Sequence, residues 1–277
     1  MQFSFFKFPI VVLSFFSLVA CNNEADTEAS ASDTSRAITE KEIQYIFDGV
    51  TMNGLIVYNA HQKIKSPAVL VVHEWWGIND YSKSRARQLA DLGYTAMAVD
   101  MYGGGQQADN PENAQSLAKP FYDDPYLAYE RLNAAINTLK KEEFVNPDQL
   151  AAIGYCYGGF VVLNAAKAGA DLKGIVSFHG NLSGLPVKKD SLQAEILICH
   201  GGNDPFVPEE EVNSFKSQMD SAGIDYSFKV YPGATHAFTN PQATATGKQF
   251  EMPISYNQEA DKKSWQDMKD FLSRLFY

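Results

Sequence analysis

The sequence has little positive charge, and this shortage restricts the partners that the protein can have. It contains 23 lysines and arginines against 33 aspartates and glutamates, which gives a formal net charge of −10 at pH 7. No cluster of basic residues interrupts this excess of negative charge. Proteins that bind nucleic acids or anionic membrane surfaces through charge carry such clusters. The composition therefore argues against nucleic acid as a partner.

Cysteine is scarce as well, with three in 277 residues: Cys21, Cys156 and Cys199. These three cysteines predict no disulfide framework. Cys199 ends the apolar segment 196–198 and is expected to be a core residue. A bridge between Cys156 and Cys199 is the alternative, and it would suit an oxidising compartment.

The sequence also lacks a metal-binding pattern and internal repeats. His73, His179 and His200 are expected at strand ends, and their spacing matches no set of metal ligands. We interpret these three histidines as structural residues. Neither a metal nor a cofactor is predicted.

The N-terminal 20 residues are not expected to belong to the fold. A nearly unbroken apolar run, 8–16, follows Lys7 and is too short for an ordinary membrane span. It leads to Leu18-Val19-Ala20-Cys21, which resembles the lipobox of bacterial lipoproteins, where cleavage precedes a lipidated cysteine. Residues 1–20 are therefore predicted to be a lipoprotein signal peptide, with lipidation at Cys21. An ordinary secretory signal and an uncleaved anchor are the alternatives.

The next segment predicts a tether to a membrane. Residues 21–38 are rich in alanine, serine, threonine and acidic residues without an apolar period, which is typical of disorder. The protein is then expected in the bacterial cell envelope, anchored to a membrane by its N-terminal lipid on the periplasmic or surface side. Residues 39–277 are long enough for one α/β domain with a sizeable core.

Beyond the tether, predicted strands alternate with predicted helices. A hairpin is expected at 43–47 and 51–58, because Asp48-Gly49 between them is a turn signal. Further strands are expected at 68–72, 95–99, 151–153, 174–178, 195–199 and 226–231. Helices are expected at about 79–92, from Asp124-Pro125 onward, from 160, at 208–222 and at about 258–276. This alternation predicts an α/β fold with a mostly parallel sheet and helices on both faces, whose chemistry lies at the carboxyl ends of the strands.

One stretch between a strand and a helix has the pattern of a catalytic turn: Gly154-Tyr155-Cys156-Tyr157-Gly158-Gly159. It matches the G-x-S-x-G nucleophile elbow with cysteine in the serine position. Such a turn exposes Cys156 above the sheet, where the N-terminal N–H groups of the next helix favour a thiolate and a developing oxyanion. A glycine-rich turn with a buried cysteine is the alternative.

Two more polar residues follow strand ends later in the chain. Asp204 ends the segment Gly201-Gly202-Asn203-Asp204, and His236 lies in the loop after 226–231. Cysteine, aspartate and histidine thus follow the order nucleophile, acid, base, which is the order of α/β-hydrolases. The simpler interpretation is that Asp204 only ends a strand, since acidic loop residues are common.

Four motifs together make the sequence resemble the dienelactone hydrolase family. They are His73-Glu74-Trp75-Trp76-Gly77, the elbow around Cys156, Gly201-Gly202-Asn203-Asp204, and Gly233-Ala234-Thr235-His236-Ala237-Phe238. The resemblance covers most of the predicted domain and implies the α/β-hydrolase fold. It also implies hydrolysis of a small ester or lactone, of the carboxymethylenebutenolidase type, without metal or cofactor.

The resemblance assigns roles to the motif residues. Cys156 is expected to attack a carbonyl as the thiolate, His236 to stabilise that thiolate and then protonate the leaving group or activate water, and Asp204 to orient His236. The backbone N–H groups of Trp75 and Tyr157 are expected to form the oxyanion hole.

Glu74 occupies the position of a glutamate that the family uses beside the cysteine in the resting state. A carboxylate there would keep the thiol protonated until substrate displaces it. The alternative is that Glu74 only caps the helix that follows.

The sequence departs from the family where a substrate carboxylate would bind. Members that act on chlorocatechol-derived lactones carry one arginine in the loop after an Asp-x-Tyr strand end and another shortly after the catalytic histidine. Residues 100–105 and 236–240 contain no arginine. A bidentate carboxylate clamp is therefore predicted to be absent, and the identity of the ester does not follow.

Several interpretations stay open at this point. The aromatic residues near the motifs either line an apolar acyl pocket or belong to the core: Trp75, Trp76, Tyr102, Phe121, Phe206 and Phe238. Cys156, Asp204 and His236 could also cleave a thioester or a peptide. A non-catalytic lipoprotein that binds a ligand or partner on a hydrolase scaffold is the alternative from another class, because a fold does not determine a function.

Overall fold

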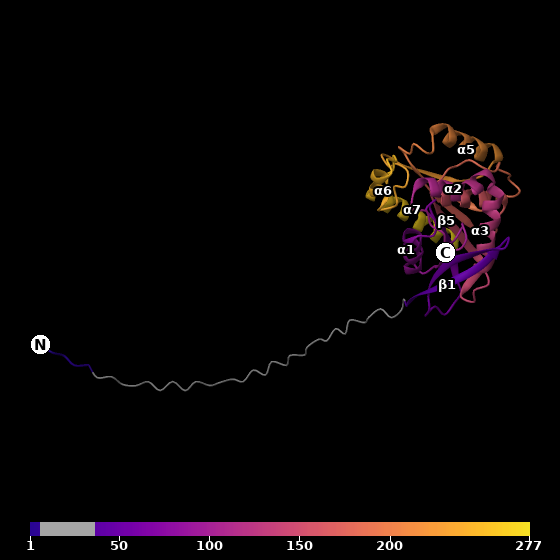
Figure 1. Ribbon diagram of the computed structural model, residues 1–277. Helices are drawn as coiled ribbons and strands as arrows, with labels where there is room; N and C mark the ends of the chain where they lie inside the picture. Colours follow the sequence, from indigo (N-terminus) through magenta and orange to yellow (C-terminus); the bar gives the residue numbers. More distant parts are fainter. Residues whose placement is uncertain (6–36) are drawn as a thin grey trace. The chain divides into compact units, whose positions relative to one another are not determined.

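The computed structural model describes residues 1–5 and 37–277 (Figure 1). The predicted lipidation site Cys21, the apolar run 8–16 and nearly all of the predicted tether lie outside the described residues. The chain separates into two units, Met1–Thr34 and Ser35–Tyr277, and the helices and strands below all belong to the second. Within the described part, no helix is long and apolar enough to cross a membrane.

Residues 37–277 form an eight-stranded, mostly parallel sheet with the order β1-β2-β4-β3-β5-β6-β7-β8. The first two strands form the predicted hairpin, β2 pairs antiparallel with β4, and the remaining neighbours are parallel. The strands are β1 (Ile38–Phe47), β2 (Val50–Asn59), β3 (Ser66–Val72), β4 (Thr95–Val99), β5 (Val145–Tyr155), β6 (Gly174–Phe178), β7 (Glu195–Gly201) and β8 (Ser227–Tyr231).

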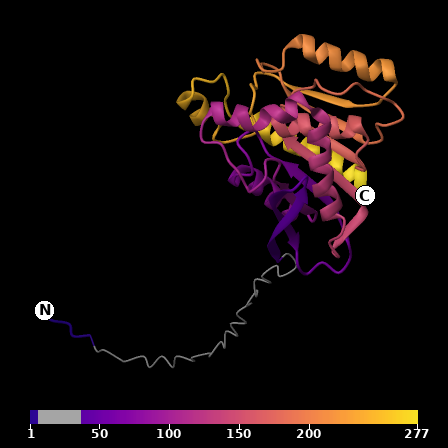
Figure 2. The same ribbon diagram turned by 45° about the vertical axis from the view of Figure 1, so that its right-hand side comes forward.

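Helices cover both faces of this sheet, as the alternation predicts. On one face, α1 (Asp80–Asp91) and α7 (Gln258–Phe276) contribute residues such as Leu89 and Leu272 to the core. On the other, α2 (Pro111–Asp123), α3 (Pro125–Leu139), α4 (Tyr157–Ala168) and α5 (Glu209–Ala222) contribute residues such as Leu132 and Val161. Strand β3 is buried throughout, because alternate side chains enter the two cores. Figure 2 shows α5 (orange) and the β1–β2 hairpin (indigo) at opposite ends of the domain.

Most predicted elements agree with the structure. The bounds of β4, β6 and α7 are those expected, and α3 begins after Asp124, whose carboxylate accepts the N–H groups of Tyr126 and Leu127. Strand β7 continues two residues beyond Cys199. Cys156 and Cys199 are both free thiols, so the alternative disulfide is not formed, and Cys199 is fully buried in the core as predicted.

Two helices were not expected from the sequence, α2 and α6 (Ala243–Gln249). Helix α2 has a start signal, because the side chain of Asn110 accepts the N–H of Asn113 and Pro111 follows the cap. Its buried face consists of Ala114, Ala118 and Phe121, however, so it has few large apolar residues, and Pro120 lies inside it. Helix α6 has seven residues and no side-chain cap. Helix α2 borders the site described next, and α6 borders a second cavity beside it.

Candidate active site

The elbow turns from strand to helix within one residue. Strand β5 ends at Tyr155, α4 begins at Tyr157, and Cys156 between them has φ of 53°. A Cβ on Gly154 would lie 2.0 Å from the carbonyl oxygen of Gly158, and one on Gly158 would lie 2.3 Å from the carbonyl oxygen of Val72. No side chain fits at such distances. The prediction of a tight strand–turn–helix that needs these glycines is confirmed.

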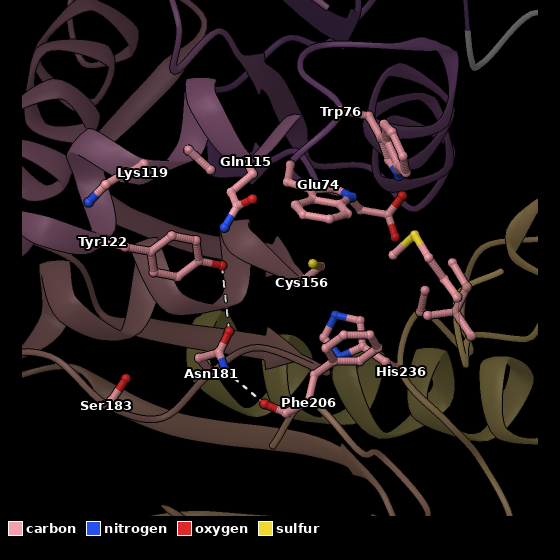
Figure 3. A pocket seen from close by; sticks show the side chains of 15 residues that line it. Glu74, Trp76, Gln115, Lys119, Tyr122, Cys156, Asn181, Ser183, Phe206 and His236 are labelled. Atoms are coloured by element: carbon pink, nitrogen blue, oxygen red, sulfur yellow. Dashed lines mark hydrogen bonds between the residues drawn. The ribbon is translucent and has the colours of Figure 1, made fainter. Parts of the chain in front are cut away.

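Cys156 and His236 face the same cavity (Figure 3). The Cys156 sulfur lies close enough to the His236 imidazole to raise the pKa of that ring. On its other side the imidazole Nδ1 donates to Oδ2 of Asp204 at 2.8 Å, and the Asp204 side chain is completely buried. The second carboxylate oxygen of Asp204 accepts the N–H of Phe206 at 2.9 Å. His236 thus lies between Cys156 and Asp204 and contacts both.

The electrostatic surroundings favour a positive charge on His236. Burial by itself lowers the pKa of this imidazole, but the charge of Cys156 and the hydrogen bonds with Asp204 and Cys156 outweigh it and raise the pKa to about 10. An imidazolium beside the sulfur is the electrostatic partner that a thiolate needs.

The two predicted oxyanion-hole residues border the nucleophile. Tyr157 is the first residue of α4, so its N–H has no acceptor within the helix. Trp75 lines the cavity, and its carbonyl oxygen accepts the hydroxyl of Tyr102 at 2.9 Å, which holds the loop in place. Among the described contacts, neither N–H donates to another protein group. Both amides are therefore available to a ligand.

Glu74 lies in the wall of the cavity, but its hydrogen-bond partner is Asn240. The Glu74 carboxylate accepts the side-chain N–H of Asn240 at 2.7 Å, and no hydrogen bond joins it to Cys156 in the described residues. Burial raises the pKa of Glu74 to about 7, although the Asn240 hydrogen bond and the charges of His236 and Arg85 lower it. The resting-state contact that the family resemblance implies is not present in this conformation.

The raised pKa of Glu74 makes a testable prediction about stability. Between its ordinary value of 4.5 and about 7, the folded chain holds a proton on Glu74 that the unfolded chain has released. The free energy of unfolding of the wild type should therefore fall, relative to that of Glu74→Gln, as the pH rises through this window, by about 3 kcal/mol in total. Urea unfolding of both proteins across and above this window measures the difference. A difference that does not change with pH would contradict the prediction.

The cavity itself has a volume of about 460 Å³. Six aromatic residues near the motifs were expected either to line a pocket or to belong to the core. Trp75, Trp76 and Phe206 line the cavity, whereas Tyr102, Phe121 and Phe238 are buried in the core. The unpredicted helix α2 supplies a whole wall, with Gln115, Ala118, Lys119 and Tyr122. The start signal at Asn110-Pro111 was the feature of the sequence that could have revealed this wall.

No arginine is among the described residues that line the cavity. Lys119 lines it, and its ammonium is paired with Asp123 at 2.6 Å on the surface. A substrate carboxylate would therefore find no bidentate partner here.

The histidines interpreted as structural do not line the cavity. Nδ1 of His179 accepts the backbone N–H of Cys156 at 3.1 Å, and Nε2 then donates to the hydroxyl of Thr239 at 2.7 Å. Burial holds the pKa of His179 well below its ordinary value, so the ring stays neutral. His73 donates to the carbonyl oxygen of Glu74, and burial lowers its pKa to about 4. Both rings position the backbone of the site.

Comparison with known proteins identifies the family. Residues 52–276 match the model of the dienelactone hydrolase family. The chain belongs to this family. It is therefore a hydrolase of the ester and lactone type, as the four motifs predict. A protein of Aquifex aeolicus, provisionally named a carboxymethylenebutenolidase, is 30% identical over 203 residues, which are 72% of this chain and 86% of that protein.

Solved structures agree with this membership. A dienelactone hydrolase-like promiscuous phosphotriesterase from metagenomic libraries has a TM-score of 0.81 and 32% sequence identity, and the match covers 87% of this chain and 99% of that one. An α/β-hydrolase enzyme from a deep-sea metagenome library has a TM-score of 0.61 at 16% identity, over 86% of this chain and 98% of that one. This second likeness shows the α/β-hydrolase fold alone. The predicted fold class is thus confirmed.

Proposed function

We propose that this dienelactone hydrolase family member cleaves a small, uncharged ester or lactone with Cys156 as the nucleophile. His236 acts as the acid and base, and Asp204 orients His236. The observation that carries this proposal is the series of contacts from Cys156 through His236 to the buried Asp204, at one end of a cavity large enough for a small ester. Because the described lining contains no arginine, the proposal excludes a substrate that depends on a carboxylate clamp.

The chemistry follows from the placement of these groups. The Cys156 sulfur attacks the carbonyl carbon, and the oxygen takes the negative charge near the N–H groups of Trp75 and Tyr157. The carbon–oxygen bond to the alcohol then breaks, and the His236 imidazolium gives its proton to the leaving oxygen. The acyl group remains on sulfur as a thioester. Water, deprotonated by His236, attacks this thioester, so the acid is released and the thiol restored. A lactone gives a hydroxy acid, because its alcohol stays attached.

The predicted lipid anchor forms part of the same proposal. The support for it is the motif Leu18-Val19-Ala20-Cys21 after the apolar run. The enzyme would then act at a membrane of the bacterial cell envelope, tethered through residues 21–38.

Stoichiometric alkylation tests the proposed nucleophile. We expect iodoacetamide to modify Cys156 and to reduce turnover of p-nitrophenyl acetate in proportion to the fraction modified. Cys199 should stay unmodified, because it is fully buried and burial raises its pKa to about 12. Peptide mass spectrometry locates the label. Complete modification of Cys156 with turnover retained would contradict the proposal, and an inert thiol without any ester turnover would favour a binding protein instead.

A further inference from the structure

A second cavity of about 470 Å³ adjoins the one that contains Cys156. Trp76 lines both cavities. Glu74 lines the first and Asn240 lines the second, and the 2.7 Å hydrogen bond between their side chains joins the two walls. Figure 3 shows the Glu74 carboxylate next to Trp76 at the edge of the first cavity. The two cavities are therefore neighbours that share Trp76 as a wall residue.

The second cavity is polar, in contrast to the first. Five side-chain amides line it: Asn79, Gln107, Asn240, Gln242 and Gln249. The amides of Asn79, Gln107 and Asn240 already hydrogen bond with protein groups. An amide has more than one donor and acceptor position, as a hydroxyl group does, so the remaining positions suit a ligand with hydroxyl groups. The described lining contains no lysine, arginine or histidine and includes Asp80 and Asp109, which disfavours an anion.

Two aromatic rings contribute apolar surface to this polar setting. The rings of Trp76 and Phe250 are stacked, with centroids 6.0 Å apart and planes 27° apart, and both line the second cavity. The apolar face of a sugar ring packs on such a surface while its hydroxyls reach the amides. A quaternary ammonium group would also contact aromatic rings, but it has no N–H or O–H group to hydrogen bond with the amides. Asp109, moreover, already accepts from the amides of Asn110 and Asn113.

The second cavity adjoins the loop that carries His236. His236 must reach the oxygen of the departing alcohol, and the loop that carries His236 continues to Asn240 and Gln242 in the second cavity. Trp76, which lines both cavities, is held in place because its carbonyl oxygen accepts the N–H of Ala108 at 3.0 Å. A Cβ on Gly77 would lie 2.2 Å from the carbonyl oxygen of Gln106, so the loop that contains Gly77 packs closely against the loop that contains Gln106.

We propose that the second cavity binds the hydroxyl-rich alcohol part of the substrate, so that the enzyme removes an acyl group from an acylated sugar or polyol. This inference rests on the proposed ester hydrolysis and names its substrate class. The acyl group occupies the cavity beside Cys156, and the sugar ring packs on Trp76 and Phe250.

Three acetate esters that differ only in the alcohol test the inference: methyl 6-O-acetyl-glucopyranoside, ethyl acetate and acetylcholine. With the wild type we expect kcat/KM for the sugar ester to exceed that for ethyl acetate about tenfold or more, and Phe250→Ala to reduce this ratio about tenfold. Lys248→Ala, on the same helix but outside the cavity lining, is the matched control and should keep the ratio. Equal kcat/KM values for the sugar ester and ethyl acetate, an unchanged ratio in Phe250→Ala, or a preference for acetylcholine would each overturn the inference.

A binding measurement separates this inference from the proposed catalysis. Methyl glucopyranoside, which has no ester, should give saturation-transfer NMR signals with the Cys156→Ala protein and lose them when Phe250→Ala is added. Absence of binding to Cys156→Ala overturns the sugar site whatever the esterase activity. Sugar binding together with no turnover of any ester by the wild type would support the site and contradict the proposed hydrolysis.

Discussion

Replacing Cys156 with alanine should lower kcat/KM for p-nitrophenyl acetate by about 10⁴-fold or more. In the proposed mechanism the sulfur forms the covalent bond, and His236 and Asp204 have the other roles of acid–base and orienting group. The remaining rate would come from binding and from the amides of Trp75 and Tyr157. Steady-state kinetics of the two purified proteins measure the loss.

Cys199→Ala is the control for this experiment. Cys199 is the other cysteine in the described residues, lies fully buried in β7 and contacts the Tyr231 hydroxyl rather than the cavity. This variant should retain turnover when it is folded, which circular dichroism checks. A Cys156→Ala protein with wild-type turnover would show that the hydrolysis, if present, uses another nucleophile.

Replacing Gly158 with alanine should destabilise the fold by about 3 kcal/mol or more. The added Cβ would lie 2.3 Å from the carbonyl oxygen of Val72 and 2.7 Å from that of His73. Both atoms belong to the backbone at the end of β3, the central strand, so neither can move away without disturbing the sheet. Urea unfolding or the yield of soluble protein measures the effect.

Gly49→Asn is the matched glycine variant. Gly49 has φ of 73°, a conformation that asparagine tolerates, and a Cβ there would meet no atom within 4 Å. We expect a loss of about 1 kcal/mol or less. If Gly158→Ala unfolds at the same urea concentration as Gly49→Asn, the elbow is more adaptable than these distances indicate.

Several parts of the structure could be predicted because their signals are local in the chain. The elbow needs glycines on both sides of Cys156, and this requirement appears within six consecutive residues. Asp124-Pro125 marks a helix start for a similar reason, since the cap and the first turn are neighbours in sequence. Parallel strands with helices between them also place the residues after each strand at one edge of the sheet. Cys156, Asp204 and His236 could thus be expected together before any distance was known.

The walls of the two cavities could not be predicted in the same way. Helix α2 forms one side of the first cavity and α6 borders the second, yet both bury mostly small residues. Their positions depend on packing against elements that are distant in the chain. The hydrogen bond between Glu74 and Asn240 could not be predicted for the same reason, because the two residues are 166 positions apart in the chain.

The sequence predicted the hydrolase family, the α/β fold and the three residues that carry the proposed chemistry. Each of these depends on short motifs whose backbone geometry or reactive group is encoded locally. Tertiary structure alone decided that Glu74 pairs with Asn240 and that Trp76 separates an apolar cavity from a polar one. The physical reason is that hydrogen bonds and cavity walls form between side chains from distant segments. Their meeting depends on how the helices pack over the sheet, which no short stretch of sequence encodes.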